Sequence, residues 1–181
     1  MILKVEDYEL RVIPITDAEM LYNTMKENAD YLSEYLDFIT TLTLESEKKA
    51  INTWQDMFLK GMGFEGGIYY KDKLIGMCGI RLSRYDDRGE IGYWLIPEFT
   101  GKGIMTKMAL NVMHMGFKVY GLNKITIMCA DTNYKSQGIP KRLGFKFDGI
   151  LRQHQKLRNE YRDLYVFSIV RSEWELFYGE E

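Results

Sequence analysis

The sequence predicts a mixed α/β fold built on a central sheet, and three observations support this prediction. Apolar residues follow a period of two through the consecutive segments 64–70, 74–82 and 90–96, which is typical of strands joined by turns. A long apolar helical segment, 103–119, comes directly after the third strand. Because a further strand-like segment, 124–130, follows this helix, the strand–helix–strand crossover implies a parallel pair of strands.

Further strands and helices flank this central segment, with no internal repeat. In chain order, the other expected elements are a strand at 8–13, a helix at 16–29, a helix at 43–61, a short helix after Asp131, and a hairpin of 145–151 with 162–170. Together with the strands above, they predict a sheet of seven strands. The central helix carries one polar stripe that includes His114, so we expect this histidine to face solvent.

Length, charge and cysteine content limit the class of protein. A chain of 181 residues is long enough for a substantial core, and we expect a single domain over residues 1–181. The formal net charge of −2 gives no sign of a nucleic-acid binder held by phosphate contacts. Cys78 and Cys129 lie in apolar strand-like segments, which argues against a disulfide framework or a zinc site and fits a reducing cytoplasm. We expect a cytoplasmic protein without a signal peptide or membrane span, because no apolar run approaches the ~20 residues that spanning requires.

The turn between the strand 90–96 and the following helix contains Gly101 and Gly103. The first N–H groups of a helix have no partner inside the helix, and the helix dipole adds partial positive charge there. Glycines also allow a ligand to approach the backbone closely. The turn therefore predicts an anion site, most often one for phosphate, although Gly-x-Gly alone is equally consistent with an ordinary strand-to-helix turn.

Three motifs occur in order along the chain and together resemble a known family. They are Glu90-Ile-Gly-Tyr-Trp-Leu95 followed by Pro97; Gly101-Lys-Gly-Ile-Met-Thr106; and Asn133-x-x-Ser136 leading to Leu143-Gly-Phe145 and Gly149-x-Leu-Arg-Gln153. From about Leu10 to Trp174 the chain resembles the GNAT acetyltransferases, in particular the RimJ/RimL-like branch of ribosomal-protein N-terminal acetyltransferases. The resemblance implies a GNAT-like α/β fold, with helices on both faces of a mostly antiparallel, twisted, seven-stranded sheet. The parallel pair is expected between its fourth and fifth strands.

The resemblance also implies that the chain binds acetyl-CoA. The pyrophosphate is expected on the N–H groups of the glycine turn, and the pantetheine arm beside the end of the strand 90–96. The residues that the resemblance assigns to cofactor binding are Leu95, Ile96, Gly101, Lys102, Gly103, Ile104, Met105, Thr106, Asn133 and Ser136. Thr100 stands where the superfamily pattern has Gln or Arg, which removes a longer side chain but leaves the backbone donors intact.

Acetyl transfer to an amine needs a path for the amine proton and a hydrogen-bond donor near the leaving sulfur. The resemblance implies that Ser136 protonates or hydrogen-bonds the departing thiolate, and that Asn133 fixes the cofactor or the segment itself. From the residues alone, structural roles are favoured instead: Asn133 as a turn or helix-cap residue, and Ser136 as a residue of the first helical turn. Glu90 is the first candidate for the base, and its alternative role is an ion pair with Arg88 or Arg81.

Two positions depart from the pattern of this branch. Gln155 stands where some relatives have a glutamate considered as a base, which leaves the base open among Glu90, His154 and a water path. Pro140 lacks an N–H group, and its ring crowds the carbonyl of Ser136 four residues earlier. We therefore expect a distorted or late-starting helix with Pro140 in its first turn.

The sequence is thus interpreted as an acetyl-CoA-dependent N-acetyltransferase that acts by direct attack in a ternary complex. The expected acceptor is the N-terminal amine of a protein, with a ribosomal protein as one candidate. A small amine such as a polyamine, an amino sugar or an antibiotic is the alternative acceptor, and a non-catalytic acyl-CoA-binding module is the alternative function. Asp30, Glu34, Asp37 and Asp87 are candidates to receive a cationic acceptor, or else form a solvated surface. A homodimer is a further expectation.

Overall fold

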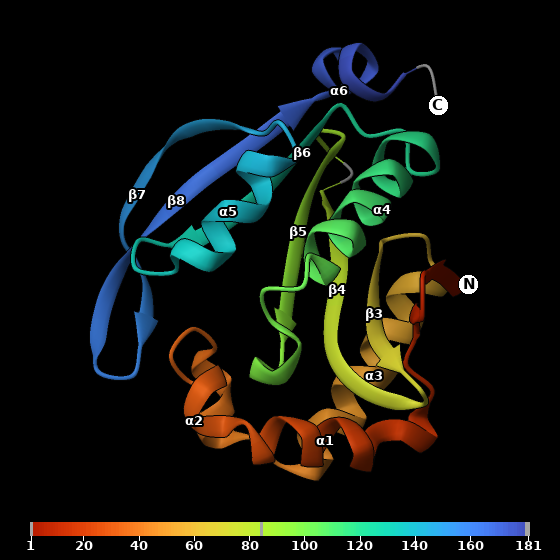
Figure 1. Cartoon of the computed structure of the whole chain (residues 1–181), viewed down its shortest axis with the longest axis vertical. Helices are drawn as coiled ribbons and strands as arrows, with labels where there is room; N and C mark the ends of the chain where they lie inside the picture. The colour runs from red at the N-terminus through yellow and green to blue at the C-terminus, as the bar shows by residue number, and fades with distance from the viewer. Residues whose placement is uncertain (1, 84, 180–181) are drawn as a thin grey trace.

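The computed structural model describes residues 2–83 and 85–179. Within this part of the chain, eight strands form one sheet in the order β1-β2-β3-β4-β5-β6-β8-β7 (Figure 1). Every neighbouring pair in it is antiparallel except β5 and β6, which run parallel. The strands are β1 Ile2–Val5, β2 Tyr8–Val12, β3 Gly63–Tyr70, β4 Lys73–Ser83, β5 Arg88–Leu95, β6 Lys124–Ala130, β7 Lys146–Leu157 and β8 Glu160–Val170.

The predicted mixed α/β fold with one parallel pair is confirmed, but the sheet has one strand more than the seven predicted. The additional strand is β1, which pairs with β2 through a tight turn at the edge of the sheet. Its four residues are exposed or only half-buried. A segment this short and this exposed carries too little apolar alternation to be recognised as a strand.

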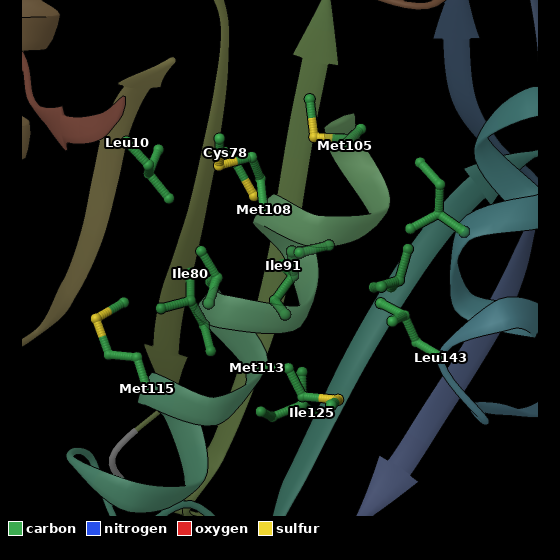
Figure 2. Close-up of a cluster of buried hydrophobic side chains, with 14 of the residues drawn as sticks. Leu10, Cys78, Ile80, Ile91, Met105, Met108, Met113, Met115, Ile125 and Leu143 are labelled. Atoms are coloured by element: carbon green, nitrogen blue, oxygen red, sulfur yellow. The ribbon is translucent and has the colours of Figure 1, made fainter. Parts of the chain in front are cut away.

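Helices cover both faces of the sheet, as expected. They are α1 Ala18–Glu27, α2 Ala29–Leu32, α3 Leu44–Leu59, α4 Ile104–Lys118, α5 Tyr134–Arg142 and α6 Arg171–Tyr178, with short 3-10 turns η1 Ile15–Asp17, η2 Asp37–Thr41 and η3 Pro97–Phe99. One core cluster lies between α4 and the sheet, and a second joins α1, α3 and the opposite face. In Figure 2, side chains of α4 such as Met108 and Met113 reach toward Ile80, Ile91 and Ile125 of the strands.

The polar stripe of α4 is not simply solvated, which corrects the expectation for His114. Its Nδ1 accepts a hydrogen bond of 2.9 Å from Nε1 of Trp174, and its ring meets those of Trp174 and Tyr178 edge-on. His114 therefore helps to dock α6 against α4. Among the described residues, no helix has both the length and the apolar character needed to cross a membrane.

The parallel pair is short, and this creates the opening that holds the candidate site. β5 pairs with β4 along its whole length, but with β6 only from Arg88 to Glu90. Beyond that point β6 continues beside β8 as far as Ala130. The two strands therefore diverge toward the end of β5 at Leu95 (Figure 1). Backbone groups on this side of β5 have no ladder partner from β6 and are left for other partners.

Candidate active site

A cavity of about 620 Å³ lies where β5 and β6 diverge. Its walls come from α2 and the turn after it, from the end of β5, from the turn that leads into α4, and from α5. Side chains alternate along a strand, so the neighbours Tyr93 and Trp94 point to opposite faces of the sheet. Since both line the cavity, it extends through the opening between the strands and reaches both faces.

All but two of the residues predicted to bind the cofactor line this cavity. The exceptions are Ile96 and Lys102. Ile96 is only 3% exposed, and its N–H donates to the carbonyl of Ile75, so its side chain belongs to the core. Lys102 is exposed and places Nζ 4.9 Å from the ring centre of Phe99.

The glycine turn at the start of α4 has the geometry that an anion site needs. Gly101 and Gly103 have φ angles of 76° and 75°, and Gly103 is the residue that precedes the helix. The first turn of α4 carries no acidic residue, so no carboxylate opposes a bound anion there. The unpaired N–H groups of this turn and the positive end of the helix dipole face the cavity together.

Arg142 is a candidate ligand-binding residue that sequence reasoning missed. It lies at the end of α5 and lines the cavity, and its Nη2 donates to Oγ1 of Thr106 at 3.1 Å. A Cβ atom on Gly138, one helical turn earlier, would lie 2.9 Å from Nη1 of Arg142, so glycine leaves room for the guanidinium group. A cationic side chain from another element thus reaches the turn in which Thr100 replaces Gln or Arg.

The predicted residues Asn133 and Ser136 come together at the start of α5. Asn133 precedes the helix, and its Oδ1 accepts from the backbone N–H of Ser136 at 3.0 Å. The side chain of Ser136 then enters a small network. Its Oγ lies 3.2 Å from the hydroxyl of Tyr93 and 3.2 Å from Sγ of Cys129. Tyr93 belongs to the first of the three motifs, but sequence analysis assigned it no role in the site.

The expectation for Pro140 is corrected. The helix α5 begins at Tyr134, directly after its cap, and Pro140 lies in its interior rather than in its first turn. Helical hydrogen bonding continues past it, because Leu143 N–H donates to the carbonyl of Ile139. The carbonyl of Ser136, which the missing N–H of Pro140 leaves free, accepts instead from the hydroxyl of Tyr93 at 3.1 Å.

The groups beside Ser136 are protonated donors rather than nucleophiles. Burial raises the pKa of the Tyr93 hydroxyl well above its usual value, with a smaller contribution from Cys129. Burial also raises the pKa of the Cys129 thiol, and its hydrogen-bond contacts with Ser136 and Tyr93 only partly oppose this. A thiol with a raised pKa holds little thiolate at neutral pH, so neither group is suited to covalent catalysis.

Glu90 lies apart from these residues. It does not line the cavity, and it occupies the face of β5 opposite to Tyr93. Burial raises the pKa of its carboxyl group, while the charges of Arg81 and His154 partly lower it. Arg81 makes its ion pair with the buried Glu65, with Nε 2.8 Å from Oε1. Arg81 thus lies between two carboxylates on this face.

The acidic residues proposed to receive the acceptor do not form one cluster. Asp30, Glu34 and Asp37 lie in or near α2, a segment that supplies several residues of the cavity wall, whereas Asp87 precedes β5 at its other end. The carbonyl of Asp87 accepts from the N–H of Asn123, next to the start of β6. Asp87 is therefore distant from the other three acidic residues.

A second cavity of about 440 Å³ adjoins the first and shares Tyr35 with it. Charged residues line it, including Glu34 of the turn after α2 and Arg158, Glu160 and Arg162 of the β7–β8 hairpin. Two hydrogen bonds tie the hairpin to this turn: Gln155 Nε2 to the carbonyl of Tyr35 at 3.5 Å, and Arg158 to Oγ of Ser33 at 3.1 Å.

Comparison with known proteins agrees with this fold. The model of the acetyltransferase (GNAT) domain family matches residues 8–146, and the chain belongs to this family. It is 30% identical over 173 residues to YdaF of Bacillus subtilis (strain 168), which is named as a provisional ribosomal N-acetyltransferase, with 94% of both chains covered. It is 25% identical over 165 residues to the ribosomal-protein-serine acetyltransferase of Escherichia coli (strain K12), covering 90% of this chain and 92% of that protein.

Among solved structures, a crystal structure of a probable acetyltransferase superimposes with a TM-score of 0.90 at 29% identity. The match covers 96% of this chain and 99% of that one. The protein is thus an N-acetyltransferase that uses acetyl-CoA. The cavity suits this cosubstrate, because the glycine turn offers backbone donors without a nearby carboxylate and Arg142 adds a positive charge.

Proposed function

We propose that this N-acetyltransferase acetylates the N-terminal amine of a protein, with a ribosomal protein as its acceptor. The observation that supports this most strongly is the second, charged cavity next to the first. A peptide whose amine enters the opening between β5 and β6 continues over this surface, whereas a small amine makes no use of it. The relatives named for ribosomal acceptors match nearly the whole chain, including the segments that line both cavities.

The chain's own residues have distinct roles in this proposal. The turn from Gly101 to Thr106 holds the pyrophosphate, and Arg142 adds a cationic contact beside it. Bound acetyl-CoA supplies a thioester, so the amine nitrogen bonds to the acetyl carbon while the carbon–sulfur bond breaks. Ser136 donates a hydrogen bond to the sulfur that leaves with the electron pair, and Asn133 fixes the backbone of Ser136.

Glu90 is the proposed acceptor of the amine proton. It lies on the sheet face opposite to Ser136, as a base should if donor and acceptor enter the opening from different faces. Burial raises its pKa, which makes its carboxylate a stronger base than an exposed glutamate. Because Glu90 does not line the cavity, we propose that a water molecule relays the proton. His154, whose charge acts on Glu90, is the alternative base.

The acceptor is tested by incubating the protein with acetyl-CoA and synthetic peptides that carry ribosomal-protein N-termini. Matched peptides with a blocked α-amine, together with a panel of polyamines, amino sugars and aminoglycosides, serve as controls. Mass spectrometry should find one acetyl group on the free α-amine only. Acetylation confined to the small amines would replace the proposed acceptor, and tight CoA binding without turnover on any amine would indicate a binding module.

We also propose a cytoplasmic location, a single domain over residues 1–181 and a homodimer. Cys78 and Cys129 are free and buried, which is consistent with a reducing compartment.

The edge strand β7 exposes Phe147, Ile150 and Leu151, and these apolar residues are a candidate contact between two copies. Sedimentation equilibrium measures the mass in solution, and a monomer at micromolar concentration would contradict the dimer.

A further inference from the structure

The interior proline of α5 exposes a specific hydrogen-bond acceptor. In an uninterrupted helix the carbonyl of Ser136 would accept from the N–H of residue 140. Pro140 has no N–H, yet α5 continues through it to Arg142. The hydroxyl of Tyr93, which comes from β5 and is 43 positions away in the sequence, lies 3.1 Å from this carbonyl oxygen. A strand residue thus supplies the donor that the helix lacks.

This contact determines the direction of the hydrogen bonds around Ser136. Tyr93 has a single hydroxyl proton, which it donates in a hydrogen bond to the carbonyl of Ser136. The tyrosine oxygen is therefore an acceptor toward Oγ of Ser136. The proton of Ser136 therefore points to Tyr93. The contact of 3.2 Å between Sγ of Cys129 and Oγ of Ser136 allows either atom to donate, so we infer that the thiol is the donor in this arrangement. Burial raises the pKa of both Tyr93 and Cys129, which keeps both donors protonated.

We propose that Tyr93 is a positioning residue for acetyl transfer, which acts through Ser136 and depends on the proline at position 140. The inference rests on the proposed role of Ser136 as the donor to the leaving sulfur. Tyr93 fixes both the backbone and the hydroxyl of Ser136 at the wall of the cavity. When the carbon–sulfur bond breaks, the hydroxyl proton of Ser136 turns from Tyr93 to the sulfur that holds the electron pair.

Cys129 strengthens this donor without entering the reaction. A hydroxyl that accepts one hydrogen bond becomes a better donor of the next, because each bond polarises its neighbour. The thiol of Cys129 keeps its proton throughout, and the proton released by the amine leaves by the separate path through Glu90. The network therefore requires no oxidant and no covalent intermediate.

Combining Tyr93→Phe with Pro140→Ala tests this arrangement. Tyr93→Phe leaves the carbonyl of Ser136 without a donor, and we expect kcat to fall roughly tenfold while the KM for acetyl-CoA changes less than about twofold. Pro140→Ala restores an N–H at position 140, so the carbonyl regains a helical partner. The double variant should recover the part of the lost kcat that depends on the backbone of Ser136, but not the part that depends on the contact between its Oγ and Tyr93. If Pro140→Ala leaves the defect of Tyr93→Phe unchanged, or if Tyr93→Phe has full activity, the proposal is wrong.

Tyr120→Phe is the matched control for loss of a tyrosine hydroxyl. Tyr120 is half-buried and donates to the carbonyl of Gly63 at 3.2 Å, but it does not line the cavity. We expect it to keep the kcat of the wild type, with or without Pro140→Ala. Circular dichroism and thermal melting of every variant separate an unfolded protein from a catalytic defect. A loss of kcat in Tyr120→Phe equal to that in Tyr93→Phe would overturn the specific role of Tyr93.

A second measurement needs no acceptor and no turnover. Isothermal titration compares the affinity of CoA with that of desulfo-CoA, which lacks the thiol, from neutral to alkaline pH. If Ser136 donates to the sulfur of CoA, the wild type should prefer CoA over desulfo-CoA, and this preference should grow as the pH rises and the thiol of CoA ionises. The preference should vanish in Ser136→Ala, fall severalfold in Tyr93→Phe and return in part in the double variant with Pro140→Ala.

These outcomes distinguish the inference from the proposed function. Equal affinity of the wild type for both ligands at every pH contradicts the role of Ser136, and with it this inference. An unchanged preference in Tyr93→Phe contradicts the positioning role of Tyr93 alone. An intact preference in a protein that acetylates no peptide would refute the proposed acceptor, while the Tyr93–Ser136 arrangement would stand.

Discussion

The two ends of the cavity are built in different ways. At the start of α4, the candidate binding groups are backbone N–H groups, placed by two glycines with positive φ angles. At the start of α5, side chains from three elements meet: Tyr93 from β5, Cys129 from β6 and Ser136 from α5. The first arrangement depends on a few consecutive residues, and the second depends on the packing of the whole sheet.

The two ends of the cavity should therefore respond differently to mutation. A backbone site tolerates changes of side chain and fails when the path of the main chain changes. A side-chain network fails when a single oxygen atom is removed, although the fold remains intact. The following predictions, from the largest expected effect to the smallest, test whether the two ends of the cavity behave in these ways.

The largest effect is expected for Ser136→Ala. Loss of the donor to the leaving sulfur should lower kcat by roughly a hundredfold, in the range typical of a lost proton-donating group. The KM for acetyl-CoA should change much less, since the pyrophosphate turn is untouched. Steady-state kinetics with a fixed acceptor peptide measures both constants. An equal loss in kcat and in CoA affinity would mean that Ser136 binds the cofactor rather than assisting the reaction.

Gly103→Val should abolish most of the CoA affinity. The space around its Cβ position is open, so the damage comes from the positive φ of 75°, which a β-branched residue adopts only with strain. We expect CoA to bind at least about tenfold more weakly, and its thermal stabilisation to disappear. Titration calorimetry and melting curves with and without CoA measure this.

Gly121→Val is the matched control for that change. Gly121 also has a positive φ, 68°, and open space at its Cβ position, but it follows the other end of α4, away from the cavity. It should destabilise the protein to a similar extent and leave CoA affinity unchanged. If both variants lose CoA equally, the effect of Gly103→Val reflects general destabilisation.

Glu90→Gln tests the proton path through the pH profile. Burial raises the pKa of Glu90, and a base works only when deprotonated, so kcat/KM should fall as the pH drops through a value above the usual range of glutamate. Glu90→Gln should lower kcat/KM and remove this acidic limb. The acceptor amine is the same in both profiles, so its own titration cancels. An identical limb in both proteins would assign the base to His154 or to water.

Arg142→Ala should have a smaller effect than the changes above. Arg142 is exposed, and an exposed cation near a phosphate contributes on the order of 0.5–1 kcal/mol, which is roughly a two- to fivefold loss of CoA affinity. The loss should shrink at high salt. Lys141→Ala is the matched control, because it removes a positive charge from the neighbouring residue. The side chain of Lys141 lies near the ring of Phe167 and does not line the cavity, so CoA affinity should not change. Gly138→Ala should have a smaller effect than Arg142→Ala, because its Cβ would crowd only the flexible end of the arginine side chain.

Much of the fold was predictable because it depends on local patterns. The alternating segments from Phe64 to Ile96, the apolar helix after Gly103 and the following strand together indicated the crossover, and the parallel pair was found there. The edge strand β1 was missed because it has only four residues, all of them exposed or half-buried. Pro140 was misplaced within its helix because the partner that makes an interior proline acceptable comes from a distant strand.

The candidate site shows the same difference between features set by local sequence and features set by long-range contacts. Sequence alone determined the glycine turn before α4 and the cap of α5 at Asn133, since each involves residues within a few positions of one another. Only the tertiary structure decided that Tyr93 contacts Ser136, that Arg142 reaches Thr106, and that Glu90 lies outside the cavity lining. The physical reason is that these contacts depend on where β5 and β6 diverge, a property of the whole sheet and not of either strand alone.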